Sequence, residues 1–367
     1  MTSSPAAENK GRLFWVDLVR ASAALMVIVL HAGSPYITRP GRFSLIQEEI
    51  IVYFESWVRV CVPLFFMVSG YLFLRKDHSE FTRPMMRAIS PLIFYSVIAA
   101  AYNFAFRDIS LSQTLNNFLF AKPFYHLWFF YTLIGIYTIF YFVRPRPLQG
   151  WNGAVFVICV MIVLGFGTEQ LLSQYFHKSS RVFMDGTFIN YLLYAFLGYY
   201  LATSPQIERK MLICSAAALA IITLAIAILT KTATAIEGKY DPIFHLYQSP
   251  LVIVASALTF LVLREIGPMV ESHAIPRRSV LFIAKYSLGI YGIYAFVLDY
   301  LRFHTPMRLI NQNAVAHIAM MTALTLVISL MLARLISRFD PLGLFVTGQP
   351  EPRPVKATHE NARGAGN

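Results

Sequence analysis

Charged side chains are scarce in this chain of 367 residues. Only 14% of the residues are Asp, Glu, Lys or Arg, whereas a soluble domain contains about 25%. The apolar fraction is 57%, with 30 Phe and 20 Tyr. These proportions exclude a soluble single domain, a disordered chain and a secreted disulfide scaffold. An integral membrane protein remains.

Cysteine is sparse as well. Cys61, Cys159 and Cys214 are far apart in apolar runs without CxxC spacing, so neither a disulfide framework nor a zinc site is indicated. We expect no bound metal. The net charge of +12 would suggest nucleic acid as the partner of a soluble protein. In a membrane protein it is typical of cytoplasmic loops rich in Lys and Arg, so we expect no nucleic-acid partner.

The apolar runs predict an all-α bundle of about ten transmembrane helices. A helix of about 20 residues crosses the hydrocarbon core, and only a helix satisfies its own backbone there. The first run is too long for the core of a signal peptide and contains charged residues. The predicted spans are 13–35, 52–74, 87–106, 124–143, 154–172, 186–203, 209–230, 246–265, 280–301 and 314–337.

The basic residues predict the orientation of this bundle. With the N-terminus in the cytoplasm, 19 of the 31 Lys and Arg residues lie in inner segments and 10 in outer segments. The positive-inside rule therefore favours two cytoplasmic termini. We expect a cytoplasmic N-terminal arm over 1–12, a membrane domain over 13–340 and a cytoplasmic, disordered tail over 341–367.

The first predicted span contains ionisable residues, each of which costs about 2.5–3.5 kcal/mol at the centre of a membrane helix. Asp17, Arg20 and His31 share one narrow face of that helix, and Arg20 and His31 lie about 16 Å apart along its axis. Asp17 and Arg20 form either a structural ion pair or part of a functional site. His31 has no charged partner within four residues. It is either a core histidine or a general base that titrates near neutral pH.

His31 is expected in the outer third of the first span, and two other spans place ionisable residues at about that depth. Arg59 follows Glu55 by four residues in the second span, which suits an ion pair. Pro63 is expected to kink that helix. His126 begins the fourth span, where an interfacial aromatic belt explains its neighbours but not the histidine. We therefore expect His31, Arg59 and His126 at one depth, which by itself does not show that they touch.

A cluster of four basic residues follows the second span, on the predicted cytoplasmic side. Its members are Arg75, Lys76, Arg83 and Arg87. The positive-inside bias alone would supply some of them. Alternatively they bind phosphate, with Arg83 and Arg87 one helical turn apart and able to clamp one polyphosphate. The chain contains no P-loop or dinucleotide fingerprint, so an ATP-driven machine is not expected.

Four sequence blocks resemble the acyltransferase-3 family of bacterial membrane acyltransferases. The resemblance spans about residues 12–340 and is greatest to the enterobacterial common antigen O-acetyltransferase branch. Two departures bear on the acceptor more than on the reaction: many members have an acidic residue where Pro63 stands, and the related branch has a histidine at Tyr294. The blocks are RLFWVDLVRASAALMVIVLH (12–31), VPLFFMVSGYLF (62–73), FYHLWFFYTL (124–133) and KYSLGIYGIY (285–294).

This resemblance implies an O-acyltransferase of the bacterial inner membrane. It would move an acyl group, usually acetyl, from cytoplasmic acyl-CoA, a co-substrate rather than a tightly bound cofactor, to a hydroxyl of an extracytoplasmic or lipid-linked glycan. Membrane lipid would be its other partner. His31 would be the catalytic histidine and Arg20 its motif partner. Asp17, Arg59 and His126 complete the catalytic candidates, with Arg59 or His126 stabilising the oxyanion, and the basic cluster would bind CoA.

A secondary transporter of a lipid-linked sugar or an organic anion is the alternative function. It would use the same intramembrane charges as a substrate pathway. Transporters tend to contain two half-repeats, and none is legible in this sequence. A purely structural membrane scaffold is a third possibility, against which the polar face of the first span argues.

Overall fold

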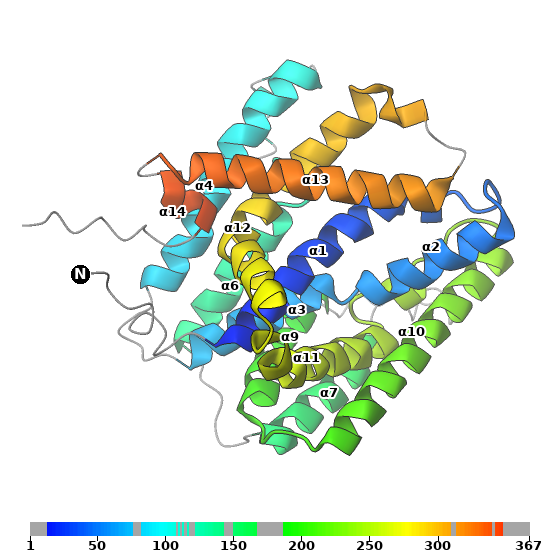
Figure 1. The fold of residues 1–367 in the computed structure, drawn as a ribbon, viewed down its shortest axis with the longest axis vertical. Helices are drawn as coiled ribbons and strands as arrows, with labels where there is room; N and C mark the ends of the chain where they lie inside the picture. The colour runs from blue at the N-terminus through cyan, green and yellow to red at the C-terminus, as the bar shows by residue number, and fades with distance from the viewer. Residues whose placement is uncertain are drawn as a thin grey trace, which may run out of the picture.

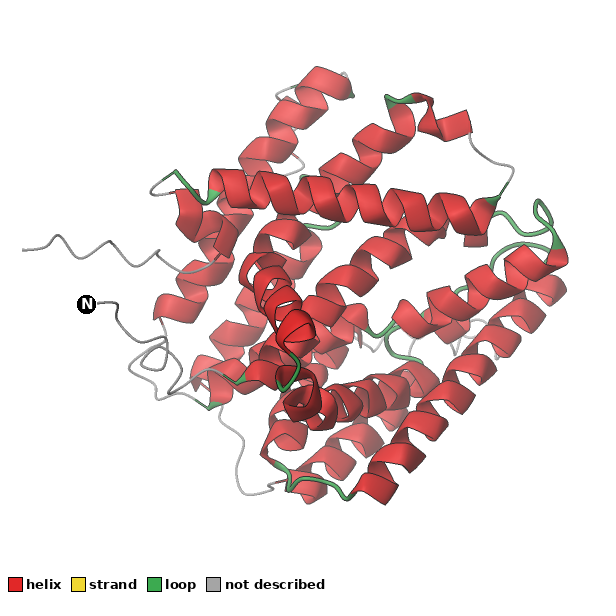
Figure 2. Ribbon diagram, viewed as in Figure 1, coloured by secondary structure: helices red, strands yellow, loops and turns green. Residues whose placement is uncertain are grey.

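The computed structural model describes residues 13–75, 82–107, 109–110, 112–113, 116, 122–142, 150–166, 186–309, 313–339 and 342–347. Every regular element within these residues is a helix, as predicted (Figure 2). Lys76, the expected arm over 1–12 and most of the expected tail over 341–367 lie outside the described residues.

Helices of very different lengths follow one another along the chain. In order they are α1 (Phe14–Ile37), α2 (Leu45–Val58), α3 (Cys61–Leu74), α4 (Thr82–Phe106), α6 (Trp128–Phe142), α7 (Gly150–Phe166), α9 (Gly186–Thr203), α10 (Arg209–Glu237), the 3₁₀ turn η3 (Ile243–His245), α11 (Pro250–Glu271), α12 (Ala274–Phe303), the 3₁₀ turn η4 (Pro306–Leu309), α13 (Ala314–Ile336) and α14 (Leu342–Thr347).

Seven stretches of the described chain are helical, long and apolar enough to cross a membrane: α1, α2 with α3, α4, α10, η3 with α11, α12 and α13. Helices α6 and α7 are apolar but shorter. The chain is therefore a multi-pass membrane protein. The total of ten spans and the cytoplasmic placement of both termini stay predictions.

The bundle has a buried centre and an apolar rim. Helix α1 runs through the middle and packs against α2, α3, α11, α12 and α13 (Figure 1). In the most apolar stretch of α12, 67% of the residues are buried, whereas in that of α10 only 17% of the residues are buried. Exposed side chains on α10, such as Ile213 and Ile221, are apolar, as a lipid-facing helix requires. Asp17 on α1 and Glu55 on α2 are buried within this bundle.

The second predicted span is two helices that meet at an arginine. Helix α2 ends at Val58 and α3 begins at Cys61, so Arg59 and Val60 form the turn between them. Pro63 lacks a backbone N–H, and its ring excludes the carbonyl of the residue four positions earlier, which is Arg59. The kink expected from Pro63 therefore lies one turn before the proline, and it places the Arg59 side chain at a helix end within the bundle.

Glycines bring α3 and α9 into backbone contact. A Cβ atom on Gly70 would overlap the Ala195 carbonyl, and one on Gly198 would overlap the Met67 carbonyl. Small residues allow this close approach between membrane helices. Helix α3 is therefore held firmly from one side, while its other side is available to line a cavity.

Candidate active site

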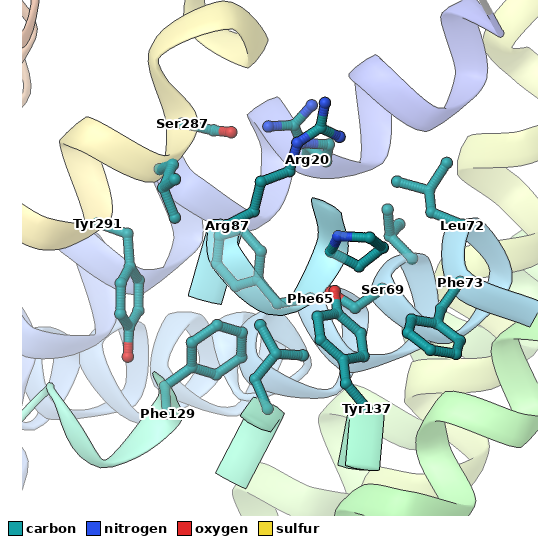
Figure 3. Close-up of a pocket in the computed structure, with 14 residues that line it drawn as sticks. Arg20, Phe65, Ser69, Leu72, Phe73, Arg87, Phe129, Tyr137, Ser287 and Tyr291 are labelled. Atoms are coloured by element: carbon teal, nitrogen blue, oxygen red, sulfur yellow. The ribbon is translucent and has the colours of Figure 1, made fainter. Parts of the chain in front are cut away.

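A cavity of about 190 Å³ opens at the end of the bundle that carries Arg20 and Arg87 (Figure 3). We call it the basic cavity. No acidic side chain is among the described residues that line it. They come from α1 (Arg20), α3 (Phe65, Val68, Ser69, Leu72, Phe73), α4 (Pro84, Arg87), α6 (Phe129, Leu133, Tyr137) and α12 (Ser287, Leu288, Tyr291).

Two arginines give the basic cavity its charge. Figure 3 shows the guanidinium groups of Arg20 and Arg87 at the same end of the cavity, and both act electrostatically on Tyr137. A buried carboxylate, Asp17, lies 4.0 Å from Arg20, as the i,i+3 spacing predicts. One carboxylate does not neutralise two guanidinium groups. This end of the cavity therefore suits the phosphate groups of an anion.

Only part of the predicted basic cluster lines this cavity. Arg87 lines it, whereas Arg83, one turn earlier on α4, is exposed and does not. Arg75 is exposed just after α3, with its guanidinium 5.4 Å from the centre of the Tyr71 ring. Lys76 lies outside the described residues. Arg20, which the resemblance makes the motif partner of His31, is the second arginine that lines this cavity; its role toward His31 stays a prediction.

Aromatic rings close the other end of the basic cavity. The centre of the Tyr291 ring is 5.7 Å from that of Phe65 and 5.1 Å from that of Phe129. The Tyr291 hydroxyl donates a hydrogen bond of 2.7 Å to the backbone carbonyl of His126. This bond fixes Tyr291 across the floor of the cavity.

His31 lies beyond that floor and faces other rings. Its ring centre is 5.6 Å from Tyr294 and 5.1 Å from Tyr125, and the Tyr294 ring is 5.8 Å from Tyr291. His31 is not among the described residues that line the basic cavity. A row of aromatic rings therefore lies between this cavity and the imidazole.

Three ionisable side chains surround His31. Arg59, His126 and Arg302 all lie within electrostatic range of its ring. The Arg302 guanidinium donates to the backbone carbonyls of His31 and, at 3.2 Å, of Ala32. The structure thus brings His31, Arg59 and His126 together at one depth. It adds Arg302, which the sequence places in an outer loop.

His126 is buried and has one ring nitrogen unused. Its Nε2 is 3.1 Å from the Gly292 carbonyl oxygen, so Nε2 carries the proton and Nδ1 is left as an acceptor. Nδ1 has no hydrogen-bond partner among the described residues. The Tyr294 hydroxyl, also buried, likewise has none there. Polar groups without partners are rare in protein interiors, and here two of them flank the histidine pair.

A chain of hydrogen bonds leads away from Arg59. Its Nη2 donates to Glu55 Oε2 and to the Tyr240 hydroxyl, both at 3.3 Å. The Tyr240 hydroxyl lies 2.9 Å from His245 Nδ1, and His245 Nε2 lies 2.9 Å from the Ser56 hydroxyl. Because Ser56 donates onward to a backbone carbonyl, it accepts from Nε2–H. The bonds therefore run in one direction, with His245 neutral. Burial raises the pKa of Tyr240, so its phenol stays protonated.

Glu55 is a buried carboxylate that packs against α1, the helix that carries His31. It is 2% exposed, and its Oε1 has no hydrogen-bond partner among the described residues. That oxygen packs against Gly33, where any Cβ atom would overlap it. Gly33 follows His31 by two positions on α1, so the glycine admits a carboxylate beside this helix.

Sequence reasoning missed Arg302, Tyr240 and His245. Each is separated from its partners by more than 180 residues along the chain or lies in a connection between helices, so no local spacing identifies it. Among the described residues, no three His, Cys, Asp or Glu side chains lie close enough together to hold a metal ion.

Comparison with known proteins relates most of the chain to one family. The model of that family, described as an acyltransferase domain, matches residues 13–334. One curated relative, an amino-acid racemase from Enterococcus faecalis, is 28% identical over 174 residues. That match covers 44% of this chain and 23% of the relative, so it spans about a quarter of the relative's length.

Proposed function

Since the chain belongs to the acyltransferase-3 family, we propose that it is a membrane O-acetyltransferase. It takes the acetyl group from cytoplasmic acetyl-CoA and transfers it to a hydroxyl of an extracytoplasmic or lipid-linked glycan. Family membership supports a multi-pass membrane acyltransferase. The acetyl donor, the glycan acceptor, the inner-membrane location and the kinship with the enterobacterial common antigen O-acetyltransferase branch belong to the proposal.

The basic cavity is the observation that carries this proposal. Coenzyme A is a polyanion on a long, thin pantetheine arm. Its phosphates suit Arg20 and Arg87, with Arg75, Lys76 and Arg83 close by in sequence, and the apolar walls suit the arm. The thioester would then reach the ring of Tyr291. The rings of Tyr291 and Tyr294 must rotate before the thioester reaches His31. For Tyr291 this rotation breaks the hydrogen bond to the His126 carbonyl.

In the proposed reaction His31 acts as the general base. Its unprotonated ring nitrogen removes the proton from the acceptor hydroxyl while that oxygen attacks the thioester carbonyl carbon. The new C–O bond forms first and the carbonyl oxygen becomes an oxyanion; when this tetrahedral intermediate collapses, the C–S bond breaks and the proton passes from His31 to the leaving CoA sulfur. Arg59 or His126 stabilises the oxyanion of the tetrahedral intermediate; because His126 Nε2–H is bonded to the Gly292 carbonyl, His126 requires a protonated Nδ1 for this role. An acyl-histidine intermediate is the variant of this scheme.

The racemase name of the curated relative does not alter this proposal. The similarity covers 23% of that protein, and its named activity is not carried over. Secondary transport is the alternative, since the same charges could form a substrate pathway. A transporter has no need of a thioester, so dependence on acetyl-CoA separates the two functions.

Two measurements test the proposal. Cells with and without the protein are compared by mass spectrometry of their surface glycans, and acetyl increments are expected only with the protein. The purified protein is then heated with acetyl-CoA, with desulfo-CoA and with neither, and both ligands are expected to raise its melting temperature. Absence of the acetyl increments together with no stabilisation by either ligand contradicts the acetyltransferase proposal.

A further inference from the structure

A second cavity, of about 340 Å³, lies between the C-terminal ends of α1 and α10 and the N-terminal part of α2. We call it the distal cavity, because it is at the opposite end of the bundle from the basic cavity. Figure 1 shows α2 and α10 side by side at this edge. Its polar lining consists of Tyr36, Glu48, Thr230, Lys231, Thr234 and Tyr240.

The distal cavity borders the surroundings of His31 on two sides. Tyr240 lines the cavity, and its hydroxyl accepts a hydrogen bond from Arg59, which lies within electrostatic range of His31. Tyr36 lines the same cavity and lies within electrostatic range of Arg302, the residue bonded to the His31 carbonyl. A ligand in the distal cavity would therefore approach the imidazole without crossing the basic cavity.

The lining of the distal cavity favours a neutral ligand rich in hydroxyl groups. It contains one acid and one base, Glu48 and Lys231, and Lys231 is paired with Glu49. Thr230 lines the cavity, and its hydroxyl, which is buried, has no hydrogen-bond partner among the described residues. Tyrosine rings supply flat apolar faces. A pyranose ring matches this set, since it offers both apolar C–H faces and hydroxyls that donate and accept.

We propose that the distal cavity binds the sugar ring of the acceptor, and that it directs a hydroxyl past the Tyr240–Arg59 pair toward His31. This inference rests on the proposed function and names the acceptor site of the same reaction. A phosphorylated group is the less suitable ligand, because the described residues that line this cavity do not include the arginines that distinguish the basic cavity.

Blocking the distal cavity with a reagent tests this proposal. Ala235 lines the cavity, is exposed and has a side chain that makes no hydrogen bond. An Ala235→Cys protein is prepared with Cys159→Ser and Cys214→Ser, because these two native thiols are exposed. Spheroplasts are treated with a membrane-impermeant methanethiosulfonate. Acetyl transfer to surface glycan is compared with the untreated sample of the same protein, and labelling is verified by intact mass.

A matched control uses Ser110→Cys in the same background. Ser110 is exposed, does not line the distal cavity, and follows α4 near the Arg107–Asp299 ion pair at the same end of the bundle. Labelling Ala235→Cys is expected to reduce acetyl transfer at least tenfold while acetyl-CoA still stabilises the purified protein. Labelling Ser110→Cys is expected to change neither property.

A second variant guards against misfolding of the first. Thr230→Val keeps the shape of the side chain and removes a hydroxyl that has no partner in the described protein, so it leaves the fold intact. Loss of one neutral hydrogen bond to the acceptor is expected to reduce transfer by about threefold to tenfold, with unchanged stabilisation by acetyl-CoA.

The possible results distinguish failure of the acceptor-site proposal from failure of the acetyltransferase proposal. Full transfer by labelled Ala235→Cys and by Thr230→Val, failure of the thiol to react, or loss of acetyl-CoA stabilisation on labelling would overturn the acceptor site while leaving the acetyltransferase intact. Absence of transfer by the wild-type protein would overturn the acetyltransferase, and the acceptor site with it.

Discussion

The two cavities lie at opposite ends of one bundle and differ in charge. The basic cavity contains two arginines and, among its described lining residues, no acid. The distal cavity contains one residue of each sign, together with hydroxyl groups. The first suits a polyanion and the second a neutral sugar. In the proposed enzyme the two substrates therefore enter from opposite sides and meet near His31. No single site has to open to each face of the membrane in turn.

Loss of the imidazole should stop acetyl transfer, the step in which the substrates of both cavities take part. We expect His31→Ala to reduce acetyl transfer by about 10²–10⁴-fold, the usual contribution of a general base. Stabilisation of the purified protein by acetyl-CoA should persist. His304→Ala, at an exposed histidine near the same end, is the control and should retain transfer. Full activity of a correctly inserted His31→Ala protein would rule out the proposed base.

Loss of one arginine should affect only the donor side. Arg87→Ala removes a charge-assisted contact to phosphate, worth about 1.5–3 kcal/mol, which corresponds to a rise in the KM for acetyl-CoA of about 10–150-fold. Arg83→Ala, one turn away and outside the cavity lining, should have a much smaller effect. Equal effects of the two substitutions on that KM would show that the phosphates bind elsewhere.

Loss of one hydroxyl should affect only the acceptor side. Tyr240→Phe keeps the ring in the distal cavity and breaks the link between Arg59 and His245. We expect transfer to fall by about three- to tenfold, with the KM for acetyl-CoA unchanged in steady-state kinetics. Tyr53→Phe, at an exposed tyrosine on α2, is the control. A change in the KM for acetyl-CoA alone would place Tyr240 on the donor side.

Ionic strength should separate the cavities without any substitution. Salt screens attraction between charges at exposed sites, so raising it should increase the KM for acetyl-CoA by a few fold. A neutral acceptor should bind equally well at both salt concentrations. Kinetics with each substrate varied in turn provide the comparison, and a salt-sensitive acceptor would indicate that it carries phosphate.

Much of the fold could be predicted from apolar runs alone. Within the described residues the predicted runs are helical, the second as two helices, because the backbone in hydrocarbon has no other way to pair its polar groups. The kink due to Pro63 was expected as well, but its place at Arg59 follows from the carbonyl that the proline ring excludes. Such consequences depend on atomic positions rather than on composition.

The candidate site was predictable only within single helices. The Asp17–Arg20 and Glu55–Arg59 pairs follow from helical spacing and are present. The separation of Arg20 from His31 by aromatic rings does not follow from spacing, because those rings come from α3, α6 and α12. The same holds for Arg302, whose long side chain reaches the His31 backbone from a distant helix.

The rings of Phe65, Tyr291 and Tyr294 lie between the basic cavity and His31, and this position matters for the cell as well as for the enzyme. A protein hollowed from both faces of an energised bilayer would become a conduit if the hollows joined. Protons and cations would run down their gradients through it between turnovers. In the proposed enzyme, the aromatic septum, held by the Tyr291 bond to the His126 backbone, would keep the bilayer electrically tight. The same septum would shield a bound thioester from hydrolysis until a sugar arrives.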